Sequence, residues 1–496
     1  MKAYRPWTPD QPYLLPPNPR DWLPEGHLAP FLLEVVESLD LSAIECAIHE
    51  KDPRGERPYH PRMMLALLLY GYCTGTFSSR KIERKTYEDV AFRFLAGGEH
   101  PDFSTICTFR RVHLAAIDGL FVQVVQVSRR VGLAKLGHIS LDGTKVSANA
   151  SKHKAMSYER MVADEVRLRD EIAQLLARAE HQDADDDKRL GPGEPELDLP
   201  AELRRRTERL ARIQVAKAAL EQEARKARAA QLREQGLRAS RAAERATEDA
   251  TRERAVARAA ARGAAADSLV PPAPSASKRA DDLPTHTPKV TRAGLPHAKA
   301  QRNFTDSDSK IMERGGEFVQ GYNCHAAVDG DSQIIVAQGA SNQPPDTHYL
   351  VPMLERVRAT TGALPAVMSV DAGFWAPSNA SWCEERGVDA YISTQRQRHG
   401  AATPTEAEVL PDEPALTPQQ RMRRKVASPE GQKIYRRRKC IPEPVFGQIK
   451  QAMGFRRFSM RGMAKAGGEW SLVCTSHNLR KLWRARLAGV QVSFEG

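Results

Sequence analysis

The sequence lacks paired cysteines, long apolar runs and a high aromatic content. Its seven cysteines are dispersed without a Cys-x-x-Cys pair, which argues against a disulfide framework and against a zinc site. The longest apolar run, residues 63–72, is too short to span a bilayer. The first residues, Met-Lys-Ala-Tyr-Arg-Pro-Trp, contain no apolar signal region. We therefore expect a soluble, cytoplasmic protein with no membrane partner.

Length and positive charge are the features that the chain does have. Its 496 residues are enough for two to four domains. Lys and Arg number 74 against 62 Asp and Glu, which gives a formal charge of +12. A basic excess favours polyanionic partners, because neutralising phosphates releases condensed counterions. Many basic proteins bind no nucleic acid, so the class of partner has to be decided by motifs.

Three acidic residues stand in settings typical of metal ligands. Asp142 and Asp371 each end an apolar run, in Gly-His-Ile-Ser-Leu-Asp-Gly and Ala-Val-Met-Ser-Val-Asp-Ala-Gly. An acid at the carboxyl end of a buried strand faces the crevice where open α/β sheets bind ligands. Glu443 follows the basic run 435–439 and opens a stretch of helical spacing. Such a set of oxygen ligands suits two Mg²⁺ ions, with Mn²⁺ as a substitute, and predicts a DNA-processing enzyme.

Composition and periodicity divide the chain into segments. A proline-rich extended arm is followed by a helical domain predicted to bind DNA. An α/β catalytic domain is interrupted after its first strand by a long helical, coiled-coil-like insertion and a disordered linker. The extended arm comprises residues 1–26, the helical domain 27–135, the insertion 156–265 and the linker 266–300. The catalytic domain comprises residues 136–155 and 301–486. Within the last of them, residues 395–430 are polar and expected to be irregular.

The insertion has two kinds of sequence. Apolar residues keep heptad-like spacing before and after a polar break at 182–198, which predicts two antiparallel helices joined by a loop. Residues 224–265 are rich in Ala, Arg and Glu and fit a solvated helix, a partner helix or a nucleic-acid clamp. The insertion as a whole could therefore either pair subunits or hold flanking DNA.

One segment of the N-terminal domain resembles the start of a recognition helix. Ser104 and Thr105 precede Phe109-Arg110-Arg111, as in a helix-turn-helix. Hydroxyl groups and arginines at a helix start can contact phosphates and base edges, so these four polar residues are candidate DNA contacts. An ordinary capped helix with a solvated basic face has the same pattern.

Without the insertion, the predicted elements follow the order β-β-β-α-β-α-β-α, which is that of the ribonuclease-H-like fold. Here the chain resembles the DDE transposases of bacterial insertion sequences, in the group with a Tyr/Arg/Glu/Lys signature. The resemblance covers most of the chain except roughly 157–300. It rests on Leu-Asp-Gly-Thr-Lys at 141–145, Asp-Ser-Lys-Ile-Met at 308–312, Gly-Tyr-Asn at 321–323, Val-Asp-Ala-Gly-Phe at 370–374 and Tyr-Arg-Arg-Arg-Lys-Cys-Ile-Pro-Glu-Pro-Val-Phe-Gly-Gln-Ile-Lys at 435–450.

The signature residues match Tyr435, Arg438, Glu443 and Lys450. The gap between arginine and glutamate is four residues instead of the family's three, unless Lys439 takes the arginine's place. Arg438 can offer a bidentate fork to one phosphate and Lys450 a point charge to another. Tyr435 could stack on a base, hydrogen-bond a phosphate, or simply pack at a helix start.

The resemblance implies a transposase that binds the terminal inverted repeats of its element and cleaves phosphodiester bonds at the ends. It then joins the 3′-hydroxyls to target DNA by two-metal catalysis. Because two ends each need an active site, a homodimer on DNA is expected, in the bacterial cytoplasm and associated with the nucleoid. The alternatives are a metal-dependent nuclease without strand transfer and a non-catalytic DNA-binding relative.

Other polar residues compete with the three acids and have structural interpretations. Asp306 and Asp308 fit capping or turn roles, and Asp329 and Asp331 fit a hairpin turn. Asp346 follows two prolines and is predicted to cap a helix. His325 and His348 are predicted to be hydrogen-bonded histidines rather than metal ligands.

Overall fold

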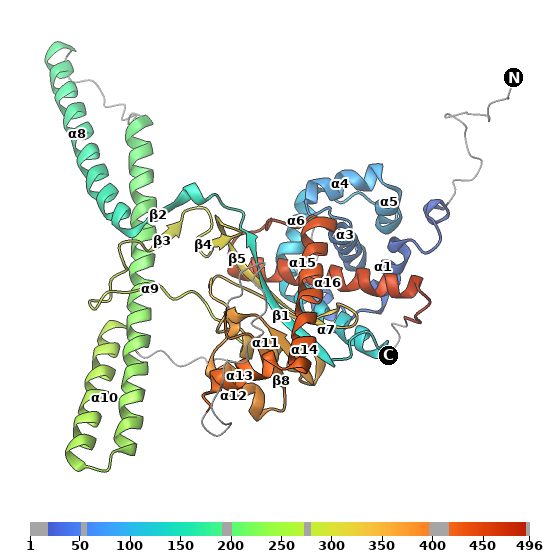
Figure 1. Cartoon of the computed structure of the whole chain (residues 1–496). Helices are drawn as coiled ribbons and strands as arrows, with labels where there is room; N and C mark the ends of the chain where they lie inside the picture. Colours follow the sequence, from blue (N-terminus) through green and yellow to red (C-terminus); the bar gives the residue numbers. More distant parts are fainter. Residues whose placement is uncertain (1–17, 51–56, 191–200, 272–278, 396–415, 493–496) are drawn as a thin grey trace.

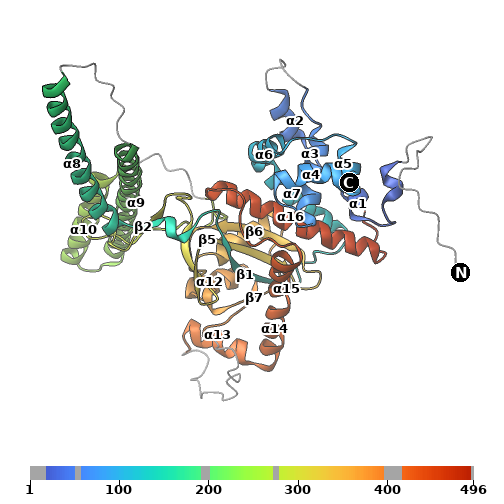
Figure 2. The ribbon, with the colours of Figure 1, turned by 90° about the horizontal axis from the view of Figure 1, so that it is seen from above.

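The computed structural model describes residues 18–50, 57–190, 201–271, 279–395 and 416–492. A mixed sheet lies at the centre, a helical N-terminal domain on one side of it and a helical arm on the other (Figures 1 and 2). The predicted mixed α/β class is confirmed at this level. Of the extended arm predicted at 1–26, most lies outside the described residues, and the described part contains the 3₁₀ turn η1, Pro19–Trp22. Within the described residues, no helix is long and apolar enough to cross a membrane.

The N-terminal domain is helical over the segment predicted to be so. Its core is α3, which begins with a proline at the first turn, where a missing N–H costs nothing, and buries almost every side chain from Met64 to Cys73. Asp89 caps the start of α5 by accepting the N–H groups of Ala91 and Phe92. The helices are α1 Leu28–Ser38, α2 Ser42–His49, α3 Pro61–Cys73, α4 Ser79–Glu88, α5 Val90–Ala96, α6 Phe103–Val112 and α7 Leu114–Arg130.

The central sheet has the strand order β6-β5-β1-β7-β8, and β4 pairs with the first half of β5. β1 runs antiparallel to β5 and parallel to β7, which in turn is parallel to β8. The predicted hairpin around Asp329-Gly330-Asp331 is present as the β5–β6 connection. The strands are β1 His138–Ser147, β4 Lys310–Arg314, β5 Glu317–Asp329, β6 Ile335–Ser341, β7 Val367–Val370 and β8 Asp389–Ile392.

Helices from the C-terminal half cover the sheet. Helix α16 packs on α3, α7 and β6 and joins the N-terminal domain to the sheet in one hydrophobic core. Its buried Asn478 bonds both the N–H and the C=O of Ile335, and its buried Trp470 donates to the carbonyl of His325. The helices are α11 Leu350–Thr361, α12 Pro377–Glu385, α13 Pro418–Ala427, α14 Pro429–Cys440, α15 Pro442–Gly447, the π-helical η5 Gln448–Ala452 and α16 Met463–Leu487.

The arm consists of α8 (Tyr158–Leu190), α9 (Ala201–Arg245) and α10 (Asp249–Leu269). Ion pairs Glu165–Lys217 and Glu171–Arg206 show that α8 and α9 run antiparallel, as predicted. The helix nevertheless continues to Leu190, through the first half of the predicted polar break. The segment 224–265 is divided between α9 and α10, which folds back on α9. A two-stranded sheet forms the base of the arm, from β2 (Ala155–Ser157) and β3 (Gln301–Asn303).

The prediction of a disordered linker at 266–300 needs correction. Helix α10 continues to Leu269, and residues 272–278 lie outside the described residues. Of the rest, residues 281–286 contact β6 and α11, and Gly294 lies against Leu269 and Arg228 of the arm. The N–H of His286 donates to Asn342 at 2.8 Å, and Arg356 donates to the carbonyl of Asp281 at 2.9 Å. Leu283 packs against the core. The polar, proline-containing composition suggested disorder. The contacts that order this segment are made with residues on or beside β6 and α11, which are far away in the sequence and could not be seen from its own composition.

Candidate active site

Two acids lie on neighbouring strands of the sheet, Asp142 within β1 and Asp371 directly after β7. The prediction that Asp142 ends its strand is wrong, because β1 continues to Ser147 in its pairing with β5. Ser140 on β1 is the register partner of Ser369 on β7, and Asp142 and Asp371 each follow two residues later. The Asp142 side chain is 20% exposed. Asp371 caps the 3₁₀ turn η3 (Ala372–Phe374), where its Oδ1 accepts the N–H of Gly373 at 2.9 Å. The parallel pairing of β1 with β7 therefore brings together two acids that lie far apart in the sequence.

The electrostatics of Asp142 are those of a largely desolvated carboxylate next to a second acid. Burial raises the pKa of Asp142 to about 7, and the negative charge of Asp371 acts in the same direction. The N–H of Gly143, at 2.7 Å, and the charge of Arg438 oppose this rise in pKa. Two carboxylates that repel each other in a desolvated place form a site that a cation would stabilise.

Arg438 connects the first acid with the third. Its guanidinium lies 4.0 Å from Asp142 Oδ2 and 4.0 Å from Glu443 Oε1. Its side chain is only 14% exposed, and its buried Nε has no hydrogen-bond partner among the described residues. Lys439 is exposed instead. The structure thus places Arg438, not Lys439, beside the acids, and the additional residue falls at the α14–α15 junction around Ile441.

The other two signature residues flank this group. Tyr435 is half-buried, its ring centroid lies 5.9 Å from the Arg438 guanidinium carbon, and burial raises its pKa. Lys450, in η5, donates to the hydroxyl of Thr144, two residues after Asp142, and burial lowers its pKa. Glu443 is 55% exposed. The structure thus gathers the signature residues beside Asp142 and Thr144 in the middle of β1, and the DNA contacts assigned to them stay predictions.

A polar cluster behind the acids was missed by the sequence analysis. Asp346 Oδ1 accepts from Asn323 Nδ2 at 2.7 Å, from His325 Nε2 at 3.0 Å and from Lys145 Nζ at 3.3 Å. Burial alone would raise the pKa of Asp346, but these donors hold it well below its usual range. The predicted helix-capping role is wrong, because α11 begins at Leu350 without a side-chain cap.

This cluster explains the glycine that follows each acid. A Cβ on Gly143 would lie 2.9 Å from His325 Nε2, so only glycine lets the His325 ring reach Asp346 across β1. A Cβ on Gly373 would lie 3.1 Å from Asp371 Oδ1 and 3.6 Å from Asp346 Oδ2. Asp346 therefore lies next to Asp371. The sequence could have indicated this cluster, because side chains alternate along a strand and Lys145 and Asp142 therefore lie on opposite faces of β1.

The remaining rival acids have structural roles, as predicted. Asp306 accepts the hydroxyl of Tyr322 and the N–H of Gly462, and Asp308 accepts the N–H of Met463. Together they fasten the loop before β4 to the start of α16. Asp329 accepts the N–H groups of residues 331 and 332 in the hairpin turn.

The candidate DNA contacts in α6 are only partly available. Asp102 is the N-cap, and its carboxylate accepts from both the N–H and the hydroxyl of Ser104 and of Thr105. The expectation for Arg110 needs correction: it is 4% exposed and donates to the Tyr72 hydroxyl and the Phe77 carbonyl. Arg111 is exposed. The helical periodicity that places Phe109 in the core also turns its neighbour inward.

The two acids have the oxygen ligand chemistry that a divalent cation prefers. Asp142 and Asp371 offer hard carboxylate oxygens, and burial and the charge of Asp371, which raise the pKa of Asp142, are both effects that a bound cation would offset. Within the described residues, no group of three His, Cys, Asp or Glu side chains is close enough to hold a metal ion. Glu443 stands across Arg438 from the pair. The structure therefore contains a pair of candidate ligands, with the third acid separated from it by an arginine.

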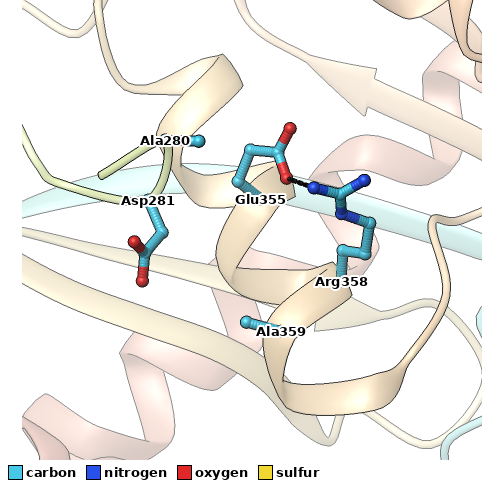
Figure 3. A pocket seen from close by; sticks show the side chains of 5 residues that line it. All are labelled: Ala280, Asp281, Glu355, Arg358 and Ala359. Carbon is cyan, nitrogen blue, oxygen red and sulfur yellow. Dashed lines mark ion pairs between the residues drawn. The ribbon is translucent and has the colours of Figure 1, made fainter. Parts of the chain in front are cut away.

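An open hollow elsewhere on the surface is lined by α11 and the segment before β3 (Figure 3). In it, Glu355 is ion-paired with Arg358 at 2.7 Å. The hollow includes neither Asp142 nor Asp371, so we place the candidate site at the acid pair.

Comparison with known families matches two separate parts of the chain. The family model described as Transposase domain (DUF772) matches residues 17–112, and the model described as Transposase DDE domain matches residues 281–479. Asp371, Arg438 and Glu443 lie inside the second match, whereas Asp142 and the arm lie between the two. No curated protein and no solved structure matches the chain.

Proposed function

Because the chain belongs to the DDE transposases of the insertion-sequence type, which are metal-dependent enzymes that cleave DNA and transfer strands, we propose the following reaction for it. It binds the terminal inverted repeats of its own element, cleaves the phosphodiester bonds at the two ends, and joins the freed 3′-hydroxyls to target DNA. The observation that supports this most is the half-buried pair Asp142–Asp371, joined through Arg438 to Glu443.

In this proposal, Asp142, Asp371 and Glu443 hold divalent cations, with Mg²⁺ as the expected ion. When bound, such ions activate the attacking water or hydroxyl and stabilise the leaving oxygen. Glu443, which is 55% exposed, is the acid with freedom to approach the pair when Arg438 turns to a phosphate.

The basic residues have complementary roles in binding the scissile strand. The guanidinium of Arg438 lies against two carboxylates, and its unpartnered Nε leaves a donor for a phosphate oxygen. Lys450 donates to the Thr144 hydroxyl, and in the proposal its ammonium group exchanges this partner for a phosphate oxygen. The positive charges of Arg438 and Lys450 also lessen the repulsion between the acids and the DNA backbone.

The N-terminal domain is proposed to recognise the element ends, with Arg111 and the exposed start of α6 among its contacts. Each of the two ends needs its own active site, so we propose at least a homodimer in the DNA complex. The chain has no acid replaced in its signature, which favours an active enzyme over a decayed DNA-binding relative.

The proposal is tested with the full-length protein and DNA that carries both ends of its element. Wild type in Mg²⁺ is expected to nick the ends and to give joined products, and neither is expected in EDTA or with Asp371→Asn. Cuts without joined products would instead identify a nuclease. End binding without any cleavage in Mg²⁺ or Mn²⁺ would identify a non-catalytic relative.

A further inference from the structure

The far half of the arm carries a row of arginines on the outer face of α9. Arg238, Arg241 and Arg245 follow one another at intervals of three and four residues, which places them on one helix face, and together with Ala242 they line an open groove. All three are exposed. This row lies in the part of the chain that neither family model matches.

The opposite face of α9 is occupied, so the row points away from the arm. Ala239 and Ala243, which alternate with the arginines, are buried. A Cβ on Gly236 would lie 3.4 Å from the carbonyl oxygen of Ala259, so α10 packs closely along this side. Arg233 fixes the two helices by an ion pair with Asp267 at 2.9 Å. The row is thus presented on a closed helical hairpin.

Two arginines of the row, Arg241 and Arg245, have no counter-charge among the described residues. Between α8 and α9, acids are matched with bases, as in Asp164–Arg209 and Glu165–Lys217. In the row, Arg238 pairs with Glu234, whereas Arg241 and Arg245 have no acid within ion-pair distance among the described residues. These two turns of helix therefore offer two unpaired guanidinium groups to an external anion.

We propose that this row, the α9 arginine row, binds the phosphate backbone of duplex DNA beyond the segment held by the N-terminal domain. The proposal rests on the proposed function only in taking DNA as the enzyme's substrate. From Arg238 to Arg245 the helix advances about 10 Å, and a DNA strand presents about three phosphates over that length. Arginine is suited to these groups, because its planar fork matches phosphate oxygens.

The position of the arm fits such a contact. In both Figure 1 and Figure 2 the arm and the N-terminal domain lie on opposite sides of the central sheet. A duplex bound at both would pass the catalytic domain between them.

The test measures DNA affinity against salt for the full-length protein in EDTA, with a mixed-sequence duplex of about 40 base pairs as the probe. The variant carries Arg238→Gln, Arg241→Gln and Arg245→Gln. Its control carries Arg167→Gln, Arg212→Gln and Arg225→Gln, which remove the same charge from ion-paired positions of α8 and α9.

The row variant is expected to bind at least about tenfold more weakly at low salt, and its slope of log K against log salt should be shallower by about 2 to 3. The control should keep the wild-type slope. Equal slopes and affinities in the two variants would overturn the proposal, as would a change in sedimenting mass without a change in slope, which would make the row a contact between subunits. Because binding is measured in EDTA and no cleavage is needed, failure of the proposed chemistry would not change the outcome of this test and would be seen separately.

Discussion

Asp142→Asn is expected to reduce end cleavage by about a thousandfold or more while leaving DNA binding intact. Asparagine keeps the size of the side chain and removes the charge that the site needs to hold a cation. A cation at the reacting phosphate contributes several kcal/mol to the transition state, and each 1.36 kcal/mol corresponds to about a factor of ten in rate. The measurement is single-turnover cleavage with enzyme in excess, together with the affinity for the same DNA in EDTA.

A surface acid serves as the matched control for this substitution. Asp331 is 58% exposed and pairs with Arg437 beside the β5–β6 hairpin, so Asp331→Asn removes the same charge outside the acid pair. It should cleave at the wild-type rate. Wild-type cleavage by Asp142→Asn would show that the acid pair is not the catalytic site.

Arg438→Gln is expected to lower cleavage by about a hundredfold to a thousandfold, whereas Lys439→Gln should change it by no more than about twofold. Loss of one charged donor at a developing negative charge typically has an effect of the larger size. Arg438 is the basic residue near both Asp142 and Glu443, and Lys439 is exposed on the other side of α14. Single-turnover rates of both variants on the same DNA make the comparison.

The same pair of variants has a pH readout. The charge of Arg438 lowers the pKa of Asp142, so its removal should raise that pKa and move the acidic limb of the pH–rate profile to higher pH. Lys439→Gln should leave the profile in place. The opposite result, with the loss of rate and the shift found in Lys439→Gln, would assign the signature position to Lys439.

Local patterns were sufficient to predict the main parts of the fold and of the candidate site. An apolar run that ends in an acid identified β1 and β7, and turn residues identified the β5–β6 hairpin. Helical spacing placed Glu443 and Lys450 on one element, although its second half is π-helical rather than α-helical. These features depend on neighbours within a few residues, which a single sequence displays directly.

The features that were missed depend on contacts between distant segments. Arg110 is inside because α3 supplies a hydroxyl for its guanidinium, and Asp346 gathers donors from two strands rather than from its own helix. The segment 395–430, expected to be irregular, contains α13 and the first residues of α14, which start at prolines 418 and 429 in the described part. Its residues 396–415 lie outside the described residues.

The most direct test of a cation-binding acid pair is the thermal midpoint of wild type and Asp142→Asn between pH 4 and pH 8, with and without Mg²⁺. The pKa of Asp142 is raised from 3.8 to about 7 in the folded protein. Its contribution to stability is therefore complete below the unfolded pKa and is lost as the pH rises through 7, a change on the order of 4 kcal/mol. Without cation, the midpoint of wild type should fall over this range relative to that of the variant. At pH 8, Mg²⁺ should restore it in wild type only. Identical pH dependence and identical responses to Mg²⁺ in the two proteins would contradict the account.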